Sequence, residues 1–246
     1  MGSEARALAG LTDPMAGALP PYDIPSVELR HAKVETGLPL GLWRSRAHAA
    51  NVFFSESFID ELAREAKLEP LSFRMQMLNG NPRLARCLTT AATLGGWDGG
   101  EAGGGLGLAC HAAFGAYIAA LVEVSVDGRR PHAVRAVCAV DCGRVVNPNL
   151  VRQQVEGGLL FGLAAALGAP IDFDAGLPTA RGFGHLDFPA LAESPDVTVE
   201  LVESEEEPGG VSELAVPVAA PALANALFTL TGRRLRSLPL VLGGGA

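Results

Sequence analysis

Glu213 is the carboxylate with the most unusual surroundings in this sequence. It follows the glycine pair Gly209-Gly210 and precedes a run of small residues that continues to Phe228. A glycine-rich turn can bring an acidic side chain against a buried surface, and burial makes a carboxylate a better proton acceptor. The pattern therefore predicts a buried general base at the start of a helix. The alternative for an acid at this place is a helix cap or a partner of the helix dipole.

A second candidate site is the turn Trp43-Arg44-Ser45, which lies between apolar segments, with His48 and Asn51 following it. An arginine in such a turn is most often a salt-bridge partner. The sequence alone therefore leaves the role of the turn Trp43-Arg44-Ser45 open. His111, in an expected strand, is a weaker candidate, because a single histidine on a strand is usually structural.

The third candidate is Gln154, in the glycine-bearing segment Leu150 to Leu167. This segment is apolar almost all round, so we expect a helix buried at the centre of the fold, where Gly157 and Gly158 permit close approach of a ligand or a strand. An amide such as Gln154 supplies both a donor and an acceptor, which suits the edge of a polar ring. The alternative is a buried amide satisfied by the backbone.

These segments follow one another in the order seen in the molybdopterin-binding large subunits of the xanthine oxidase/aldehyde oxidase family. The chain resembles the isoquinoline 1-oxidoreductase beta-type branch of that family. The residues that carry the resemblance are Gly41 to Leu62, Val140-Asp141-Cys142-Gly143, Val146-Asn147-Pro148, Gln154 to Gly158, Gly209 to Pro217, Ala220 to Phe228 and Thr231 to Leu240.

The resemblance implies a set of site residues. Glu213 would be the catalytic base beside the molybdenum, with Ser212 next to it. The residues implied to contact or line the cofactor are Gln154, Gly157, Gly158, Trp43, Arg44, Ser45 and Ser212. Three positions depart from the family pattern, because Ser212 replaces a glycine and Leu214 and Val218 replace prolines. Since serine restricts the backbone that glycine frees, we expect the turn to be locally rebuilt.

The resemblance also implies a function and partners. We expect part of a molybdenum hydroxylase that oxidises aldehydes to carboxylic acids with water as the oxygen source. The alternatives are hydroxylation of N-heteroaromatic substrates or a non-catalytic assembly module. The implied cofactor is molybdopterin, as its cytosine dinucleotide, with molybdenum. The implied partners are an upstream molybdenum-domain chain or segment, an iron–sulfur subunit that removes electrons and, further along the electron path, a c-type cytochrome or flavin subunit.

Composition and charge bear on nucleic-acid binding, membrane insertion, cellular location and the role of the cysteines. The net charge of −8 and the pI near 5.1 argue against a nucleic-acid footprint, which needs a basic face. No run of 18 apolar residues is present, and no signal peptide is visible at Met1. The sequence does not distinguish a location in the cytoplasm from one in the periplasm, which the chain would reach together with its partners. The four cysteines are interpreted as small buried hydrophobes.

The alternation of periodic segments predicts an α+β fold with mixed sheets and packed helices. We expect residues 1–81 to be the tail of a first molybdopterin-binding domain and residues 82–246 to form a second, so that the chain is a fragment or a split subunit. Strands are expected at Val27 to Val34, Leu106 to Val126 (one long strand or two), His132 to Val140 and Val197 to Val202. Further helices are expected at Ser55 to Lys67, Pro70 to Met77, Arg83 to Gly95 and Pro221 to Thr231.

Overall fold

The structure, a computed structural model, describes residues 13–32, 34, 37, 41–168 and 170–243. Its centre is a mixed sheet in the order β1-β2-β3-β6. The strands are β1 (Leu106–Ala113), β2 (Ala116–Asp127), β3 (Arg130–Asp141) and β6 (Asp196–Leu201). The first three form an antiparallel meander, and β6 runs parallel to β3.

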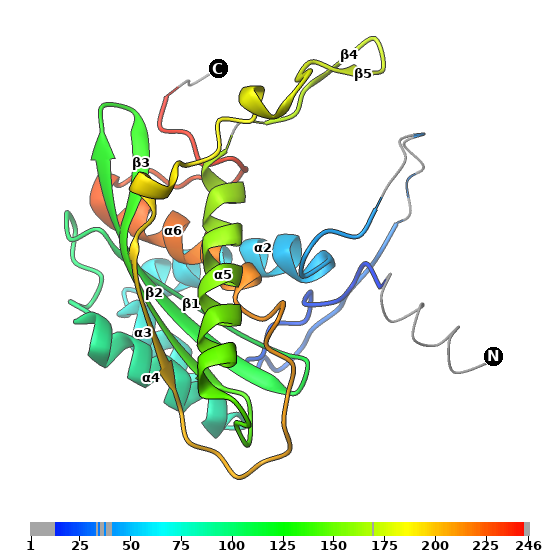
Figure 1. The fold of residues 1–246 in the computed structure, drawn as a ribbon. Coiled ribbons are helices and arrows are strands. Elements are labelled where there is room, and N and C mark those ends of the chain that lie inside the picture. Colours follow the sequence, from blue (N-terminus) through cyan, green and yellow to red (C-terminus); the bar gives the residue numbers. More distant parts are fainter. Residues whose placement is uncertain (1–12, 33, 35–36, 38–40, 169, 244–246) are drawn as a thin grey trace, which may run out of the picture.

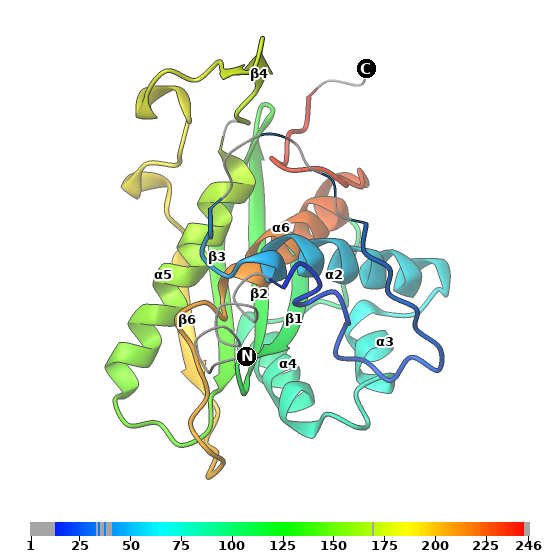
Figure 2. The same ribbon diagram turned by 90° about the vertical axis from the view of Figure 1, so that its right-hand side faces the viewer.

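Helices cover both faces of this sheet (Figure 1). Helix α4 (Pro82–Gly95) packs on one face, and α5 (Pro148–Leu167) and α6 (Val216–Thr231) pack on the other. Helix α2 (Ala47–Glu65) lies against α6, and the short α3 (Pro70–Gln76) joins α2 to α4 (Figure 2). The expected α+β class is therefore confirmed.

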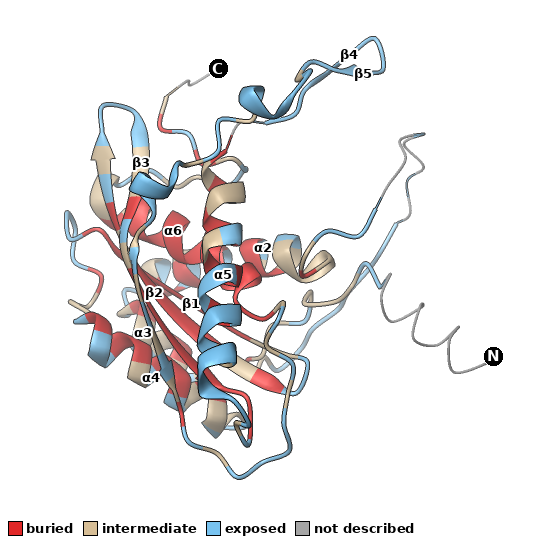
Figure 3. Ribbon diagram, viewed as in Figure 1, coloured by how far each residue is buried: buried red, intermediate tan, exposed pale blue. Residues whose placement is uncertain are grey.

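The central strand β2 is apolar on both faces because both are covered. Ile118 and Val122 point toward α5 and α6, whereas Ala119 and Leu121 point toward α4. A strand that is buried on both sides reads as a continuous apolar run, and Figure 3 shows the middle of the sheet coloured as buried. The segment from Leu106 to Val126 forms two strands, which meet at a tight turn at Phe114.

Helix α6 is buried on nearly all sides because it lies between the sheet, α2 and α5. It crosses β1 at Gly107, where an added Cβ would lie 2.2 Å from the carbonyl oxygen of Ala222. At the same crossing the Asn225 side chain donates a hydrogen bond to the Leu108 carbonyl oxygen at 3.0 Å. Asn225 therefore holds the helix against the strand.

A buried ion network joins the two ends of the chain. The Glu56 carboxylate on α2 accepts hydrogen bonds from Arg74 Nε at 3.2 Å and from the Tyr22 hydroxyl at 2.6 Å. One turn further along α2, Asp60 accepts a hydrogen bond from Arg234 Nη2, beyond α6, at 2.7 Å. Buried charges are tolerated only when they are paired in this way. Two of the motifs that carry the family resemblance are thus tied together by ion pairs.

Asparagine caps start α4 and α5. The side chain of Asn147 accepts a hydrogen bond from the Leu150 amide at 3.2 Å, and Pro148 occupies the first turn of the helix. Proline suits this position because the first amides of a helix have no partner within it. Asn81 and Pro82 repeat the arrangement in α4.

Several expectations about elements are wrong or need adjustment. The described residues between Val27 and Val34 form no strand, and their alternating apolar side chains are exposed because no strand or core lies beside them. Helix α2 begins eight residues before Ser55, and α6 begins five residues before Pro221, which the helix accommodates internally. Helix α5 is not central, since only one face of it is buried.

Smaller elements complete the description. Strands β4 (Phe173–Asp174) and β5 (Leu177–Pro178) form a short hairpin, and two 3-10 turns occupy Phe183–His185 and Leu191–Glu193. All four cysteines are buried and free. In the described part of the chain, none of the helices is long and apolar enough to span a membrane. Side chains from both sides of residue 81 share one core, and the division into 1–81 and 82–246 stays a prediction.

Candidate active site

Glu213 lies in the turn that leads into α6. The chain reaches this turn along the β1–β2 hairpin, where the Gly210 amide donates to the Phe114 carbonyl oxygen at 2.8 Å. An added Cβ on Gly209 would lie only 2.5 Å from the carbonyl oxygen of Gly115. Glycine is therefore required at position 209 by the close approach of two backbones, and this approach fixes the path of the chain toward Glu213.

The backbone after Arg44 is strained. Ser45 has φ 71° and Arg46 has φ 52°, backbone angles that residues other than glycine rarely adopt. Each such residue costs about 1–3 kcal/mol, and residues of this kind gather at ligand sites. Ser45 is also fully buried, and its hydroxyl has no hydrogen-bond partner among the described residues. The turn thus combines a strained backbone with an unsatisfied polar group.

Arg44 joins three segments that are far apart in the sequence. Its Nε donates to the Ser212 carbonyl oxygen at 2.7 Å, and its Nη2 donates to the same oxygen. Nη2 also lies 3.3 Å from the Gln154 carbonyl oxygen and 3.4 Å from Gln154 Oε1. The guanidinium therefore connects the 43–46 turn, helix α5 and the turn that carries Glu213.

The Glu213 carboxylate lies beside a different arginine. Arg46 Nη2 is 3.6 Å from Glu213 Oε2, and the two side chains are 24% and 26% exposed. The expectation of a fully buried carboxylate is thus wrong for the part of the chain that the structure describes. The acid is partly open to solvent because its turn lies at the edge of the core rather than within it.

Two histidines contact each other next to this ion pair. His48 Nδ1 lies 2.9 Å from His111 Nε2, so one ring donates to the other. Burial, and after it the nearby His48, lowers the pKa of His111 from 6.5 to about 3. Burial also lowers the pKa of His48, against the charge of Glu213, which raises it. Both rings are therefore neutral at pH 7, and the Phe114 ring stacks near His48 with centroids 5.0 Å apart.

The exposed face of α5 presents the third candidate segment. Gln154 is exposed, and at Gly157 an added Cβ would meet open space. Gly158 differs, because an added Cβ there would lie 3.3 Å from the Ala215 Cβ and 3.4 Å from an Arg44 nitrogen. Gly158 therefore serves the packing of α5 against the start of α6. Further along this face Phe161 stacks on Trp43, with ring centroids 4.8 Å apart.

The structure thus brings most of the expected residues together. Arg44, Gln154 and Ser212 are in direct contact, and Glu213 follows Ser212. The residue that sequence reasoning missed is Arg46, because nothing in its spacing shows that a strained backbone places its side chain beside Glu213. Asn51 has a structural role, since its side chain donates to the Ala16 carbonyl oxygen at 2.9 Å.

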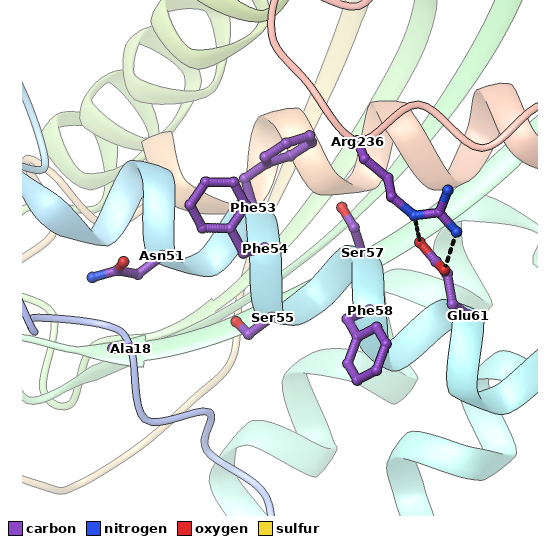
Figure 4. Close-up of a pocket in the computed structure, with 9 residues that line it drawn as sticks. All are labelled: Ala18, Asn51, Phe53, Phe54, Ser55, Ser57, Phe58, Glu61 and Arg236. Carbon is purple, nitrogen blue, oxygen red and sulfur yellow. Dashed lines mark hydrogen bonds and ion pairs between the residues drawn. The ribbon is translucent and has the colours of Figure 1, made fainter. Parts of the chain in front are cut away.

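A separate open pocket of about 490 Å³ lies along α2, away from Glu213 (Figure 4). Phe54 and Phe58 line it with exposed rings. At one end the Arg236 guanidinium binds the Glu61 carboxylate through bonds of 3.0 and 2.6 Å. The Glu61 carboxylate of this pocket is thus paired, and among the described residues no histidine lines the pocket that could activate Ser55 or Ser57. The Glu213 region is therefore the better candidate for a catalytic site.

Comparison with known proteins agrees with this picture. Residues 90–195 match the model of a molybdopterin cofactor-binding domain. The chain is 33% identical to the beta chain of isoquinoline 1-oxidoreductase from Brevundimonas diminuta, over 93% of this chain and 30% of the relative. It is 28% identical to a nicotinate dehydrogenase subunit of Pseudomonas putida, over 91% of this chain and 20% of the relative. The chain thus spans less than a third of these relatives.

The fold also matches a solved structure. The aldehyde oxidoreductase from Desulfovibrio gigas superposes with a TM-score of 0.65 over 80% of this chain and 40% of that one, at 14% identity. This likeness concerns the fold alone. The domain match and the sequence identity show that the chain belongs to the molybdopterin-binding subunits of the xanthine oxidase family and corresponds to part of such a subunit.

Proposed function

We propose that this chain forms part of a molybdenum hydroxylase in which Glu213 is the general base. The proposal rests mainly on Arg44, which holds the Glu213 turn against Gln154 and the strained turn at Ser45. A carboxylate placed at such a junction can accept a proton while oxygen from water is added to an electrophilic carbon.

The residues around Arg44 fit a pterin cofactor. The Ser45 hydroxyl is buried without a partner among the described residues, so it is available to a ligand. The oxygen of the Gln154 side-chain amide contacts Arg44, and no described residue accepts a hydrogen bond from its nitrogen, so the nitrogen can donate to a ligand. Gly157 faces open space and lets a ring approach the helix backbone. We therefore assign Ser45, Gln154 and Gly157 to cofactor contact, and Arg44 and Gly158 to holding the walls of the site.

When bound, the molybdenum and its pterin would supply the oxygen nucleophile and take up two electrons. The chain's own contribution is to hold the Glu213 carboxylate where it can receive the proton released in that step. Trp43 and Ser212 would line the same space, Trp43 through its ring and Ser212 through its backbone. We propose the cytosine dinucleotide form of the cofactor, in line with the family resemblance.

The departures from the family pattern are compatible with an active turn. Ser212 does not have a positive φ, so serine needs no conformation reserved for glycine there. Leu214 precedes α6 and Val218 lies in its first turn, and both side chains are fully buried in the core. These packed side chains can fix the turn in place of the two prolines.

Two substrate classes offer the required electrophilic carbon. The low aromatic content of the chain, 6%, favours aldehydes. However, Trp43, Phe114 and Phe161 gather around this site with 44%, 36% and 39% exposure, and exposed rings favour a planar substrate. The names of two relatives, isoquinoline 1-oxidoreductase and nicotinate dehydrogenase, also favour a planar ring as the substrate. We therefore propose an N-heteroaromatic ring as the substrate and aldehyde oxidation as the second candidate.

The same proposal includes partners. The curated relatives are much longer than this chain, so we propose that an upstream molybdenum-domain chain or segment completes the cofactor cleft. An iron–sulfur subunit would receive the electrons, and a c-type cytochrome or a flavin subunit would carry them onward.

Glu213→Gln tests the role of the base in the assembled enzyme. The amide cannot accept the proton, so kcat should fall by about 10²- to 10⁴-fold while molybdenum and pterin contents stay at wild-type levels. The matched control is Glu207→Gln, which changes an exposed acid of the preceding loop. Near-normal turnover by a fully metallated Glu213→Gln enzyme would remove the proposed role.

A non-catalytic assembly module is the competing function. It predicts that the correctly assembled complex contains neither molybdenum nor pterin. Metal analysis and pterin fluorescence of the purified complex separate the two hypotheses before any substrate is tried.

A further inference from the structure

Arg46 has hydrogen-bonding capacity that none of the described residues uses. Its contact with Glu213 is 3.6 Å long, beyond the 2.7–2.9 Å typical of a charge-assisted hydrogen bond. Among the described residues, no acceptor forms a hydrogen bond with its guanidinium, whereas Nε and Nη2 of Arg44, two residues earlier, donate to Ser212 and Gln154. The Arg46 side chain is also 24% exposed, so a ligand can reach it.

The position of Arg46 is maintained by a strained backbone. Its φ of 52° directly follows the φ of 71° at Ser45. Strained residues persist where the surrounding structure fixes them, and they are frequent in ligand clamps. Here Arg44 and the burial of Ser45 fix the turn and leave the Arg46 guanidinium beside Glu213.

The groups around Arg46 define the ligand that it would take. The charges acting on the adjacent His48 come from Glu213, Arg46 and Asp13, and the His48 ring is itself neutral at pH 7. A guanidinium with free donors binds a carboxylate through paired hydrogen bonds. The exposed Phe114 ring, next to His48, offers an apolar face for a planar group.

We propose that Arg46 is a specificity residue that binds an anionic substituent, such as a carboxylate, on a planar substrate. The substrate anion would replace Glu213 as the partner of Arg46 and leave the Glu213 carboxylate free to accept the proton. This inference rests on the proposed function, because it assigns the substrate class of the same site.

The test compares ligands that differ only in charge, with the complete molybdenum subunit in complex with its partners. Pyridine-3-carboxylate is paired with pyridine-3-carboxamide, and 4-formylbenzoate with 4-formylbenzamide. The wild type should prefer the charged member of each pair that it oxidises. Arg46→Met should reduce this preference, measured as the ratio of the two kcat/KM values, by about 10- to 100-fold, as expected for a lost hydrogen bond between charged groups.

Two further variants sharpen the result. Arg46→Lys keeps the charge but not the paired donors, so its ratio should lie between those of the wild type and Arg46→Met. Arg135→Met is the matched control, because Arg135 also pairs with a glutamate, Glu123, but on the sheet. It should leave the ratio unchanged. An equal loss for charged and neutral substrates in Arg46→Met would show a purely structural ion pair and overturn the proposal.

A binding measurement keeps this test separate from that of the proposed function. Calorimetric titration of the complex with benzoate and benzamide needs no turnover. Benzoate should bind more tightly to the wild type, and Arg46→Met should lose that difference. Equal affinities in the wild type would overturn the inference whether or not the complex oxidises any substrate, whereas absence of molybdenum and turnover would overturn the proposed function alone.

Discussion

Arg44→Met is the substitution whose consequences the structure defines best. The guanidinium makes two contacts with the Ser212 carbonyl oxygen and two longer ones with Gln154. Methionine fills a similar volume but donates no hydrogen bond. The turn that carries Glu213 would then lose its connection to α5, although the core under α6 would remain.

The expected loss of kcat follows from how strongly the reaction rate depends on the position of a catalytic group. A shift of about 1 Å in a catalytic group can cost about 10²-fold in rate. We therefore expect Arg44→Met to lower kcat by about 10²-fold with little change in KM, provided that the cofactor is retained. Arg44→Lys should retain part of the activity, because an ammonium group can reach Ser212 but cannot bridge to Gln154 as a planar fork does.

The assay is steady-state kinetics of the assembled enzyme, normalised to its molybdenum content. Arg30→Met is the control, since the Arg30 side chain is 83% exposed and its partner among the described residues is the neighbouring Glu28. If Arg44→Met loses activity only in proportion to lost molybdenum, Arg44 holds the cofactor rather than the Glu213 turn. Wild-type kcat at full loading would refute the reasoning altogether.

Two further predictions concern stability of the assembled protein. Gly162→Val should lower Tm, at a cost of about 1–3 kcal/mol, because an added Cβ at Gly162 would lie 2.6 Å from the Ala219 Cβ; Gly157→Ala, which meets open space, is the control measured in the same thermal scan. His111→Asn should reduce acid sensitivity. Burial lowers the pKa of His111 from 6.5 to about 3, so the unfolded chain binds one more proton between these values. The free energy of unfolding therefore falls as pH decreases from 6.5, by up to about 1.4 kcal/mol per pH unit, and denaturant titrations at several pH values measure the slope.

Each of these stability predictions has a contrary outcome. Equal Tm values for Gly162→Val and Gly157→Ala would mean that α5 can move away from α6 without cost. An unchanged pH slope in His111→Asn would mean that groups other than this buried ring cause the acid sensitivity.

Local sequence signals were sufficient for most elements. The expected helix at Arg83 to Gly95 corresponds to α4, and the expected strands at Leu106 to Val126 and His132 to Val140 correspond to β1, β2 and β3, because the periods of helices and strands are local properties. Apolar alternation failed at Val27 to Val34, because none of the described strands pairs with this segment. Apolar composition also overestimated the burial of α5, since it does not tell which face meets the core.

The sequence by itself determined that Glu213 follows a specified glycine turn and that the motifs occur in the family order. It also determined the α+β class, because the periods of helices and strands are local properties. Only the tertiary structure decided which groups surround that acid. The contact of Arg44 with Ser212 joins residues 168 positions apart, and the Arg46 side chain reaches Glu213 through a backbone conformation that residue type does not predict. Such contacts depend on how α2, α5 and α6 pack together, so no local pattern could reveal them.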